Sequence, residues 1–252
     1  MIVRKSDTRK ATPLTHLELK TARAKEHLDE LDAELRKTLV PEPYTITRQD
    51  YPKKFRHVIR VQTKAIPPEI ALLIGEFAYC LRSGLDQLAW GLARLHVSCP
   101  RRATSFPIRD DPKAGLGDSV KDMPSAAVDE IESLQPYHRG ARFQDHPLWI
   151  LNRLCTIDKH RTIALKETEI RGRVVGVGPS DYKIRQLDYG IEISVSLSNV
   201  FEVNFEPEPM EIIFGEPVPS CYGGFEVRIT TLRTIHDFVR DDVIPRFAGF
   251  FK

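Results

Sequence analysis

The sequence predicts an α+β fold, with a helical bundle core and an antiparallel sheet formed by the C-terminal strands and an N-terminal hairpin. Three observations predict it. Apolar residues recur every three or four positions through residues 11–165, the pattern switches to alternation in residues 166–231, and a short alternating stretch at about 44–63 interrupts the helical part. We expect residues 1–252 to form a single α+β unit that ends in a helix over residues 232–252.

The first predicted helix begins at Thr12 and Pro13, which supply an N-cap and a proline in the first turn. Leucines three or four residues apart, or at multiples of that spacing, continue the helix until Pro41. Alternating apolar residues on both sides of a turn at residues 50–52 then predict a β-hairpin at about 44–63.

The second long helix begins after Pro67 and Pro68 and carries an apolar stripe as far as Leu95, before Pro100 stops it. Residues 98–125 hold prolines, glycines and charges with few apolar residues between them. We expect a long surface connection there, and such segments are often functional.

A short helix over residues 125–134 and a loop rich in histidine and arginine over residues 136–142 come next. Pro147 opens another helix, which is predicted to run from Leu148 to about Leu165. This helix holds most of the candidate functional residues of the chain.

The residues after this helix alternate with a period of two and are divided by glycine and proline, which predicts β-strands. The predicted strands are 173–177, 191–197, 200–205, 211–214 and 225–230. The final amphipathic helix is expected to bend or break at Pro245, because proline lacks the N–H that a helix interior uses.

The composition predicts a soluble globular chain and excludes a disordered tail or a histone-like polycation. Hydrophobic residues make up 41% of the chain, and 37 basic against 35 acidic residues leave a net charge of +2. No apolar run approaches the ~20 residues of a membrane-spanning helix, and residues 1–10 lack the apolar segment of a secretory signal. We therefore expect a cytoplasmic protein without membrane contact, whose four scattered cysteines are reduced and which needs no cofactor.

Two oppositely charged pairs are predicted to meet between helices. Asp158 and Arg161 fall on the leucine-rich side of their helix, three positions apart, and Arg82 and Asp86 are four apart on the second long helix, beside small residues that let another helix approach. Because burying a lone charge is expensive, we expect the four side chains to form one ionic cluster. The cluster either only fixes the register of the helices or belongs to a catalytic site.

Arg153 and His160 lie on the opposite side of the same predicted helix, seven residues and about 10.5 Å apart. In one interpretation, His160 is a general acid or base and Arg153 binds a phosphate, a pairing that suits metal-independent RNA cleavage through the 2′-hydroxyl. In the other interpretation, the two residues belong to a solvated helix face.

Four strings of the sequence occur together in a distinctive order. They are LRSGLDQLAW at residues 81–90, FPI at 106–108, LQPY at 134–137 and DKHR at 158–161. With this spacing they resemble an uncharacterised family of bacterial proteins over residues 67–165. The resemblance identifies a family signature and implies no particular activity.

A second resemblance is to the HEPN superfamily, helical modules that are common in toxin, antiviral and RNA-processing systems. Its active motif is an arginine followed by a histidine after a few intervening residues, and six residues separate Arg153 from His160. The resemblance implies RNA as the substrate, and catalysis at the groove of a homodimer to which both copies of the helix contribute.

A metal site is not expected. His138, Asp145, His146 and His160 are the residues that could gather around zinc, but their spacing matches no familiar ligand framework.

Two functions remain open from the sequence. The first is a HEPN-like module that cleaves or binds RNA, with His160 and Arg153 as the catalytic residues. The second is a non-catalytic binding or assembly protein, whose sheet or long connection contacts a protein partner. In that case the four charged residues of the cluster are structural: Arg82, Asp86, Asp158 and Arg161.

Overall fold

The computed structural model describes residues 12–39, 44–167, 172–175, 182–187, 190–196, 204–207, 212–215 and 225–252. The chain divides into two compact units. The helical unit comprises the described residues up to 31 together with 71–163 and 229–252, and the sheet unit comprises those within 32–70 and 164–228. The predicted α+β fold class is confirmed. The organisation as a single α+β unit stays a prediction, because the two longest helices each contribute residues to both units.

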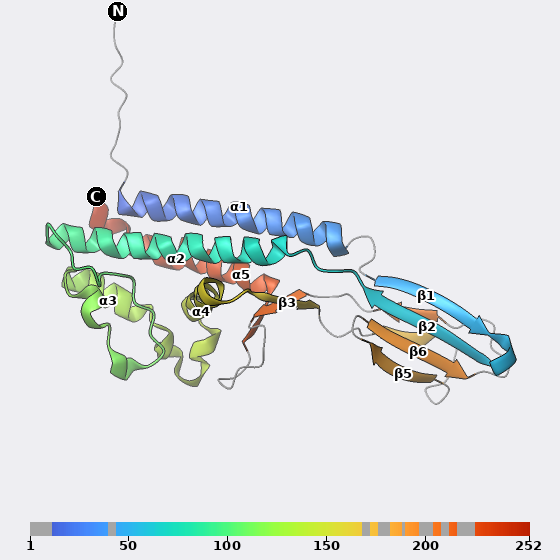
Figure 1. Ribbon diagram of the computed structural model, residues 1–252. Coiled ribbons are helices and arrows are strands. Elements are labelled where there is room, and N and C mark those ends of the chain that lie inside the picture. The colour runs from blue at the N-terminus through green and yellow to red at the C-terminus, as the bar shows by residue number, and fades with distance from the viewer. Residues whose placement is uncertain are drawn as a thin grey trace, which may run out of the picture. The chain divides into compact units, whose positions relative to one another are not determined.

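Helices α1 (Pro13–Leu39) and α2 (Glu69–His96) run side by side in opposite directions (Figure 1). The predicted N-cap is present, since the Thr12 hydroxyl oxygen accepts a hydrogen bond from the N–H of Thr15 at 3.1 Å. The two helices approach closely at Gly91, where a Cβ would lie 2.2 Å from the ring of Pro13. A side chain at this position would therefore force the start of α1 away from α2.

Shorter helices complete the helical unit (Figure 1). They are α3 (Ser125–Ser133), the 3-10 helix η4 (Pro136–Asp145), α4 (Pro147–His160), α5 (Ile229–Asp237), the π-helical turn η5 (Phe238–Val243), α6 (Ile244–Phe247) and the 3-10 turn η6 (Ala248–Phe251). The long connection after α2 contains two short 3-10 turns, η2 (Pro112–Ala114) and η3 (Gly117–Val120). Fully buried side chains from α2, α4, α5, α6 and the connection form the core, among them Leu81, Leu85, Phe106, Leu151, Leu154, Leu232 and Phe247.

One predicted helix boundary is corrected by the structure. The helix expected to reach Leu165 ends at His160, and Leu165 belongs instead to strand β3 (Ala164–Glu167). The C-terminal helix, which is expected to bend or break at Pro245, contains a wider π-helical turn that ends at Val243, just before this proline. Since Pro245 cannot donate to the carbonyl four residues earlier and its ring crowds that carbonyl, a wider turn before it relieves the conflict.

The sheet unit is antiparallel throughout its described strands. The largest sheet has the order β1-β2-β6-β5, which joins the hairpin of β1 (Tyr44–Tyr51) and β2 (Arg56–Thr63) to β6 (Gly190–Ser196) and β5 (Tyr182–Leu187). The smaller sheets are β3-β8-β9 and β4-β7, with β4 (Gly172–Val175), β7 (Asn204–Pro207), β8 (Ile212–Gly215) and β9 (Glu226–Arg228). The predicted pairing of the N-terminal hairpin with C-terminal strands is therefore confirmed. Residues 200–203, the first part of one predicted strand, lie outside the described residues.

The two faces of the four-stranded sheet differ in polarity because side chains alternate along each strand. One face buries Ile59 and Val61 of β2 with Ile191, Ile193 and Val195 of β6, and Phe205 of β7 and Val174 of β4 pack against it. The register places the intervening residues of β2 and β6 on the other face. That face is mostly polar.

Candidate functional site

The predicted ionic cluster is assembled only in part. On α2, a guanidinium nitrogen of Arg82 lies 3.2 Å from Oδ1 of Asp86. Asp158 of α4 approaches Gly75 of α2 so closely that a Cβ there would come within 2.4 Å of its Oδ1. Among the described residues, however, no ion pair joins Asp158 to a basic side chain.

Arg161 is exposed and does not belong to the cluster. The reason is the early end of α4, since Arg161 is its C-cap and has an extended backbone, with φ −152° and ψ 163°. The three-residue helical spacing that would direct Arg161 toward Asp158 therefore does not exist. The expectation of a four-member cluster is corrected to an Arg82–Asp86 pair with Asp158 nearby.

The Arg82–Asp86 pair holds the backbone of the long connection. Nη1 of Arg82 donates a hydrogen bond to the carbonyl oxygen of Phe106 at 2.9 Å, and the N–H of Phe106 donates to Oδ1 of Asp86 at 3.0 Å. The Phe106 side chain is fully buried and meets the ring of Phe247 edge to face, with centroids 6.4 Å apart. Both polar groups of a buried residue are thus satisfied by one ion pair.

Gln135 performs the same task for the next residues of the connection. Its side-chain amide donates to the carbonyl oxygens of Pro107 at 3.0 Å and Ile131 at 2.8 Å, and its side-chain oxygen accepts from the N–H of Arg109 at 2.8 Å. Three of the four signature strings therefore meet at one place. There they hold residues 106–109 against α2 and the end of α3, a structural task.

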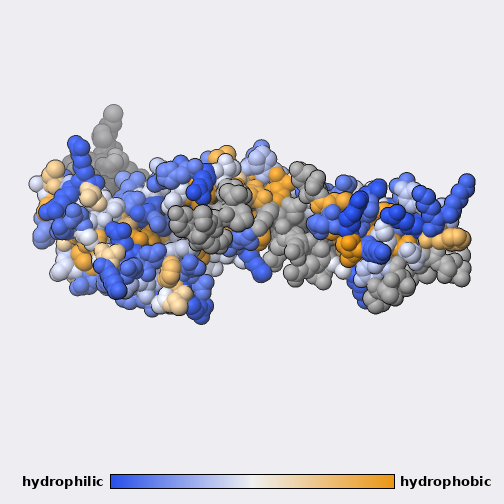
Figure 2. Space-filling model, turned by 60° about the horizontal axis from the view of Figure 1, so that its bottom comes forward, coloured by the Kyte–Doolittle hydropathy of each residue, from blue (hydrophilic) through white to orange (hydrophobic). Residues whose placement is uncertain are grey.

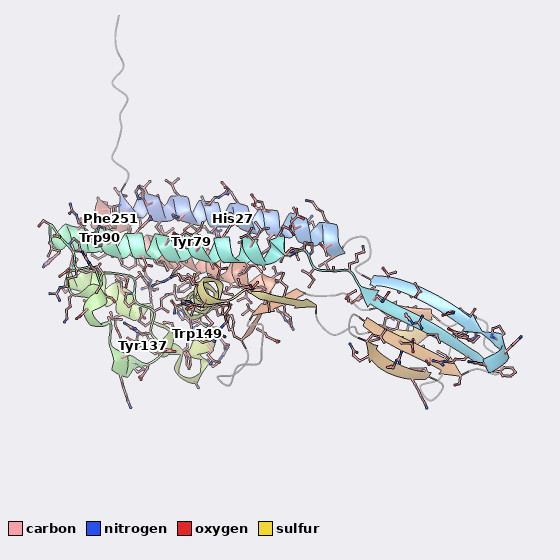
Figure 3. All side chains as sticks on the ribbon, in the orientation of Figure 1. His27, Tyr79, Trp90, Tyr137, Trp149 and Phe251 are labelled. Atoms are coloured by element: carbon pink, nitrogen blue, oxygen red, sulfur yellow. The ribbon has the colours of Figure 1, made fainter. Side chains whose placement is uncertain are left out.

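A small hollow lies between α2 and α4 beside this pair, with Tyr79 of α2 labelled in Figure 3. It encloses about 60 Å³, well below the ~300 Å³ of an ordinary ligand pocket. Burial raises the pKa of the Cys155 thiol in its wall to about 12, so this cysteine is not a nucleophile near neutral pH. The lining residues are Tyr79, Arg82, Ser83, Asp86, Cys155, Asp158 and Lys159.

A wider hollow of about 430 Å³ lies between α1 and α2. Two of its cations already have partners, because Lys20 lies over the ring of Tyr79, 5.4 Å from the centroid, and Arg23 donates to Glu26 at 2.6 Å. This leaves little charge for a ligand.

Arg153 and His160 do not line either hollow. Helical geometry places them roughly 150° around the axis of α4 from Cys155. His160 is the last residue of the helix and is exposed, whereas Arg153 is half-buried and has partners of its own. Neither of the two hollows, which the described residues line, therefore brings these two residues together, and the catalytic roles predicted for them stay predictions.

The histidines considered for zinc are not grouped. Among the described residues, no set of three or more histidine, cysteine, aspartate or glutamate side chains is placed to hold a metal ion. His146 is buried, its Nδ1 accepts the N–H of Leu148 at 3.1 Å, and its ring meets Phe238 edge to face. This histidine caps α4, which explains its position without a ligand.

The sheet unit carries a second group of charges, on the polar face of the four-stranded sheet. The Glu192 carboxylate on β6 lies 2.9 Å from Nε of Arg60, 3.2 Å from Arg185 and 3.9 Å from Arg56. The Glu192 side chain is only 7% exposed, whereas those of Arg56, Arg60 and Arg185 are 44%, 42% and 70% exposed. One buried carboxylate therefore fixes three guanidinium groups at the surface.

The positive charge on this face exceeds the negative. Lys183 shares the face with Arg185, because it pairs with Ser194, two residues from Glu192. Among the described residues on this face of the sheet, four cations and one anion leave three positive charges in excess. Figure 2 shows one side of the protein, on which the described residues of the sheet unit are mostly hydrophilic.

Sequence reasoning did not single out this basic face. Arg56 and Arg60 alternate with apolar residues in β2, a signal that places them together on one face. The partners on β5 and β6 lie more than a hundred residues away, and only the register brings them opposite each other.

In the part of the chain that the structure describes, no helix is both long enough and apolar enough to span a bilayer. No family model, no curated protein and no solved structure matches this chain.

Proposed function

We propose that this protein binds RNA without cleaving it, through the polar face of the four-stranded sheet. The observation that carries the proposal is the arginine group around Glu192. Three guanidinium groups offer about fifteen N–H donors, whereas one carboxylate accepts about four hydrogen bonds. Most donors of Arg56, Arg60 and Arg185 therefore remain for an external anion.

Phosphodiester groups suit these donors. A guanidinium binds two oxygens of one phosphate at once, and a buried carboxylate that fixes its direction reduces the entropy lost on binding. The remaining polar side chains on the face carry hydroxyl or amide groups, which suit phosphate oxygens and the 2′-hydroxyl of ribose. Among these side chains are Thr45, Thr47, Gln49, Gln62, Ser194 and Ser196.

Cleavage is not part of the proposal. Acid–base cleavage needs a histidine and a phosphate-binding cation positioned together around one reacting group. His160 lies exposed at the end of α4, outside the hollows, and Arg82 and Asp86 are occupied by the backbone of Phe106.

The decisive variant removes two arginines from the sheet, Arg60→Gln with Arg185→Gln. A matched control removes two exposed arginines from the helical unit, Arg139→Gln with Arg142→Gln, and so changes the net charge equally. Fluorescence anisotropy with a labelled RNA should show affinity weakened by about tenfold or more in the sheet variant at ~0.1 M salt. The dependence of affinity on salt should also become shallower, because fewer counterions are released.

The control variant should bind like the wild type. Equal weakening in both variants would assign the binding to net charge alone, and no binding by the wild type would remove the proposal. Equal affinity for DNA of the same sequence would contradict the choice of RNA.

A separate measurement tests cleavage. Labelled RNA is incubated with wild-type protein and with His160→Ala in the presence of a chelator. We expect intact RNA in both samples. Cleavage by the wild type alone would restore His160 and Arg153 as catalytic residues.

A further inference from the structure

The tip of the β1–β2 hairpin has an exposed aromatic ring that the fold does not use. The 3-10 turn η1 (Pro52–Lys54) ends at Phe55, whose N–H donates to the carbonyl oxygen of Pro52 at 3.1 Å. The Phe55 side chain is 69% exposed. Its ring therefore adds almost nothing to the core of the sheet unit.

The backbone of Phe55 is unusual as well. With φ 46° and ψ 48° it is left-handed, and among the described residues it is the only one besides glycine with a positive φ. This conformation brings Cβ close to the carbonyl oxygen and costs a bulky residue roughly 1 kcal/mol or more, which glycine avoids. Folding alone thus favours a glycine here on two counts, conformation and exposure, and an unfavourable residue of this kind suggests a binding role.

Basic residues flank Phe55 in the sequence. Lys53 and Lys54 precede Phe55 and are exposed, and Arg56 follows it. Arg56 is also a member of the arginine group on the polar face, where its Nη2 donates to the hydroxyl oxygen of Ser194 at 2.7 Å. The tip is therefore continuous with the basic face.

We propose that Phe55 stacks on an unpaired base, so that the face selects single-stranded over double-stranded RNA. This inference rests on the proposed RNA binding. An exposed aromatic ring beside basic side chains can stack on a base while the cations contact the neighbouring phosphates. In a duplex both faces of each base are already covered by its neighbours, so the ring gains nothing there.

An anionic bilayer also attracts lysines beside a phenylalanine. One ring, however, inserts little apolar area, and the hydroxyl and amide groups of the adjoining face gain nothing from lipid. The geometry therefore favours a base over a membrane, and the experiment includes vesicles as the opposing outcome.

The test compares wild-type protein with Phe55→Gly, which removes the ring and relieves the backbone, and with Phe55→Trp, which keeps a stacking surface. Affinities are measured for a single-stranded RNA of about a dozen nucleotides and for a duplex of equal length. Phe55→Gly should weaken single-strand binding about tenfold and leave duplex binding unchanged, and Phe55→Trp should bind the single strand like the wild type. The control Ile184→Ala, which truncates another exposed apolar residue of the sheet unit, should change neither affinity.

The outcomes separate this inference from the proposed function. If the wild type binds neither RNA, the proposed function fails. If it binds RNA and Phe55→Gly binds the single strand equally well, only the stacking inference fails. Vesicles containing phosphatidylserine should not bind, and vesicle binding that Phe55→Gly abolishes while RNA binding stays intact would overturn the inference in favour of a membrane.

Discussion

The arginines of the helical unit and those of the sheet unit differ in how far their donors are occupied. Arg82 has a side chain only 17% exposed, and it contacts both Asp86 and the carbonyl oxygen of Phe106. Arg185 is 70% exposed and contacts a carboxylate that it shares with Arg56 and Arg60. Arg82 therefore serves the fold of the helical unit, whereas Arg185 retains most of its N–H donors for an external partner.

The extent to which the donors of an arginine are occupied within the fold distinguishes a structural charge from a binding charge better than the residue type does. Both groups contain an arginine–carboxylate pair, and the sequence singled out only the helical pair. In the structure that pair satisfies buried backbone groups, and its loss would leave an N–H and a carbonyl without partners. The arginines around Glu192 carry more positive charge than this carboxylate neutralises. A polyanion recognises such excess charge when it is held at a surface.

The largest effect is expected from Phe106→Ala, because the ring of Phe106 is fully buried against Phe247. We expect the free energy of unfolding of the helical unit to fall by about 4 kcal/mol. The two tryptophans, Trp90 and Trp149, both lie in the helical unit, so urea unfolding followed by tryptophan fluorescence reports that unit. Phe55→Ala in the sheet unit should leave that transition unchanged. A loss below about 1 kcal/mol for Phe106→Ala would contradict the contribution of this buried ring to the core.

The second effect concerns pH. Burial, with smaller contributions from Arg139 and His138, lowers the pKa of His146 from 6.5 to about 4. Between these values the unfolded chain binds a proton that the folded chain does not, so stability is fully present above about pH 6.5 and is lost as the pH falls toward 4. The loss at pH 4 is on the order of 3 kcal/mol.

The variant His146→Asn isolates this contribution, because asparagine also caps helices but does not titrate in this range. Urea unfolding of the helical unit at several pH values should show a weaker decline in the variant than in the wild type. An identical decline in both proteins would assign the acid sensitivity to other groups.

The third effect is that of Asp86→Ala, which removes the acceptor of the Phe106 N–H and the partner of Arg82. We expect a loss of about 2 kcal/mol, since a buried N–H is left without a partner. Asp145→Ala is the matched control, because Asp145 pairs with Arg142 at an exposed site where both side chains are more than half exposed. That change should lower the free energy of unfolding by less than about 0.5 kcal/mol. Equal losses in the two variants would show that the Arg82–Asp86 pair stabilises the fold no more than an exposed ion pair does.

The smallest effect is expected for Arg185→Gln in the sheet unit. Its charge is exposed and in excess, so the free energy of unfolding should change by no more than about 0.5 kcal/mol. The shift of the thermal unfolding midpoint, measured by far-ultraviolet circular dichroism, checks this. Arg82→Gln in the helical unit should lower stability by about 1 to 2 kcal/mol. If Arg185→Gln proved the more destabilising, the arginines around Glu192 would be structural after all.

The fold class and the two long helices could be predicted from local sequence. Thr12 and Pro13 mark the start of α1, and Pro67 and Pro68 precede α2, because caps and proline act within one turn of the chain. The end of α4 could not be predicted in the same way. Leu165 continues the leucine spacing, but it pairs with Phe214 in the β3–β8 ladder, and such distant pairing overrides local pattern.

The candidate site, like the fold, was predictable where local sequence determines it and not where distant contacts do. Spacing placed Arg82 near Asp86 and separated Arg153 from the leucine-rich side of its helix, since both follow from helical geometry alone. The partner of the Arg82–Asp86 pair, the backbone of Phe106, lies twenty residues further on and left no periodic signal.

By itself, the sequence determined where helices begin, which faces are apolar, and that an N-terminal hairpin joins C-terminal strands. The tertiary structure decided which charges are neutralised. Arg82 meets the backbone carbonyl of Phe106 and Arg185 meets a carboxylate it shares with Arg56 and Arg60, and the sequence around each arginine reveals neither of these contacts. Local preferences act over a turn or a strand, whereas the satisfaction of a charge depends on groups that only folding brings within hydrogen-bonding distance.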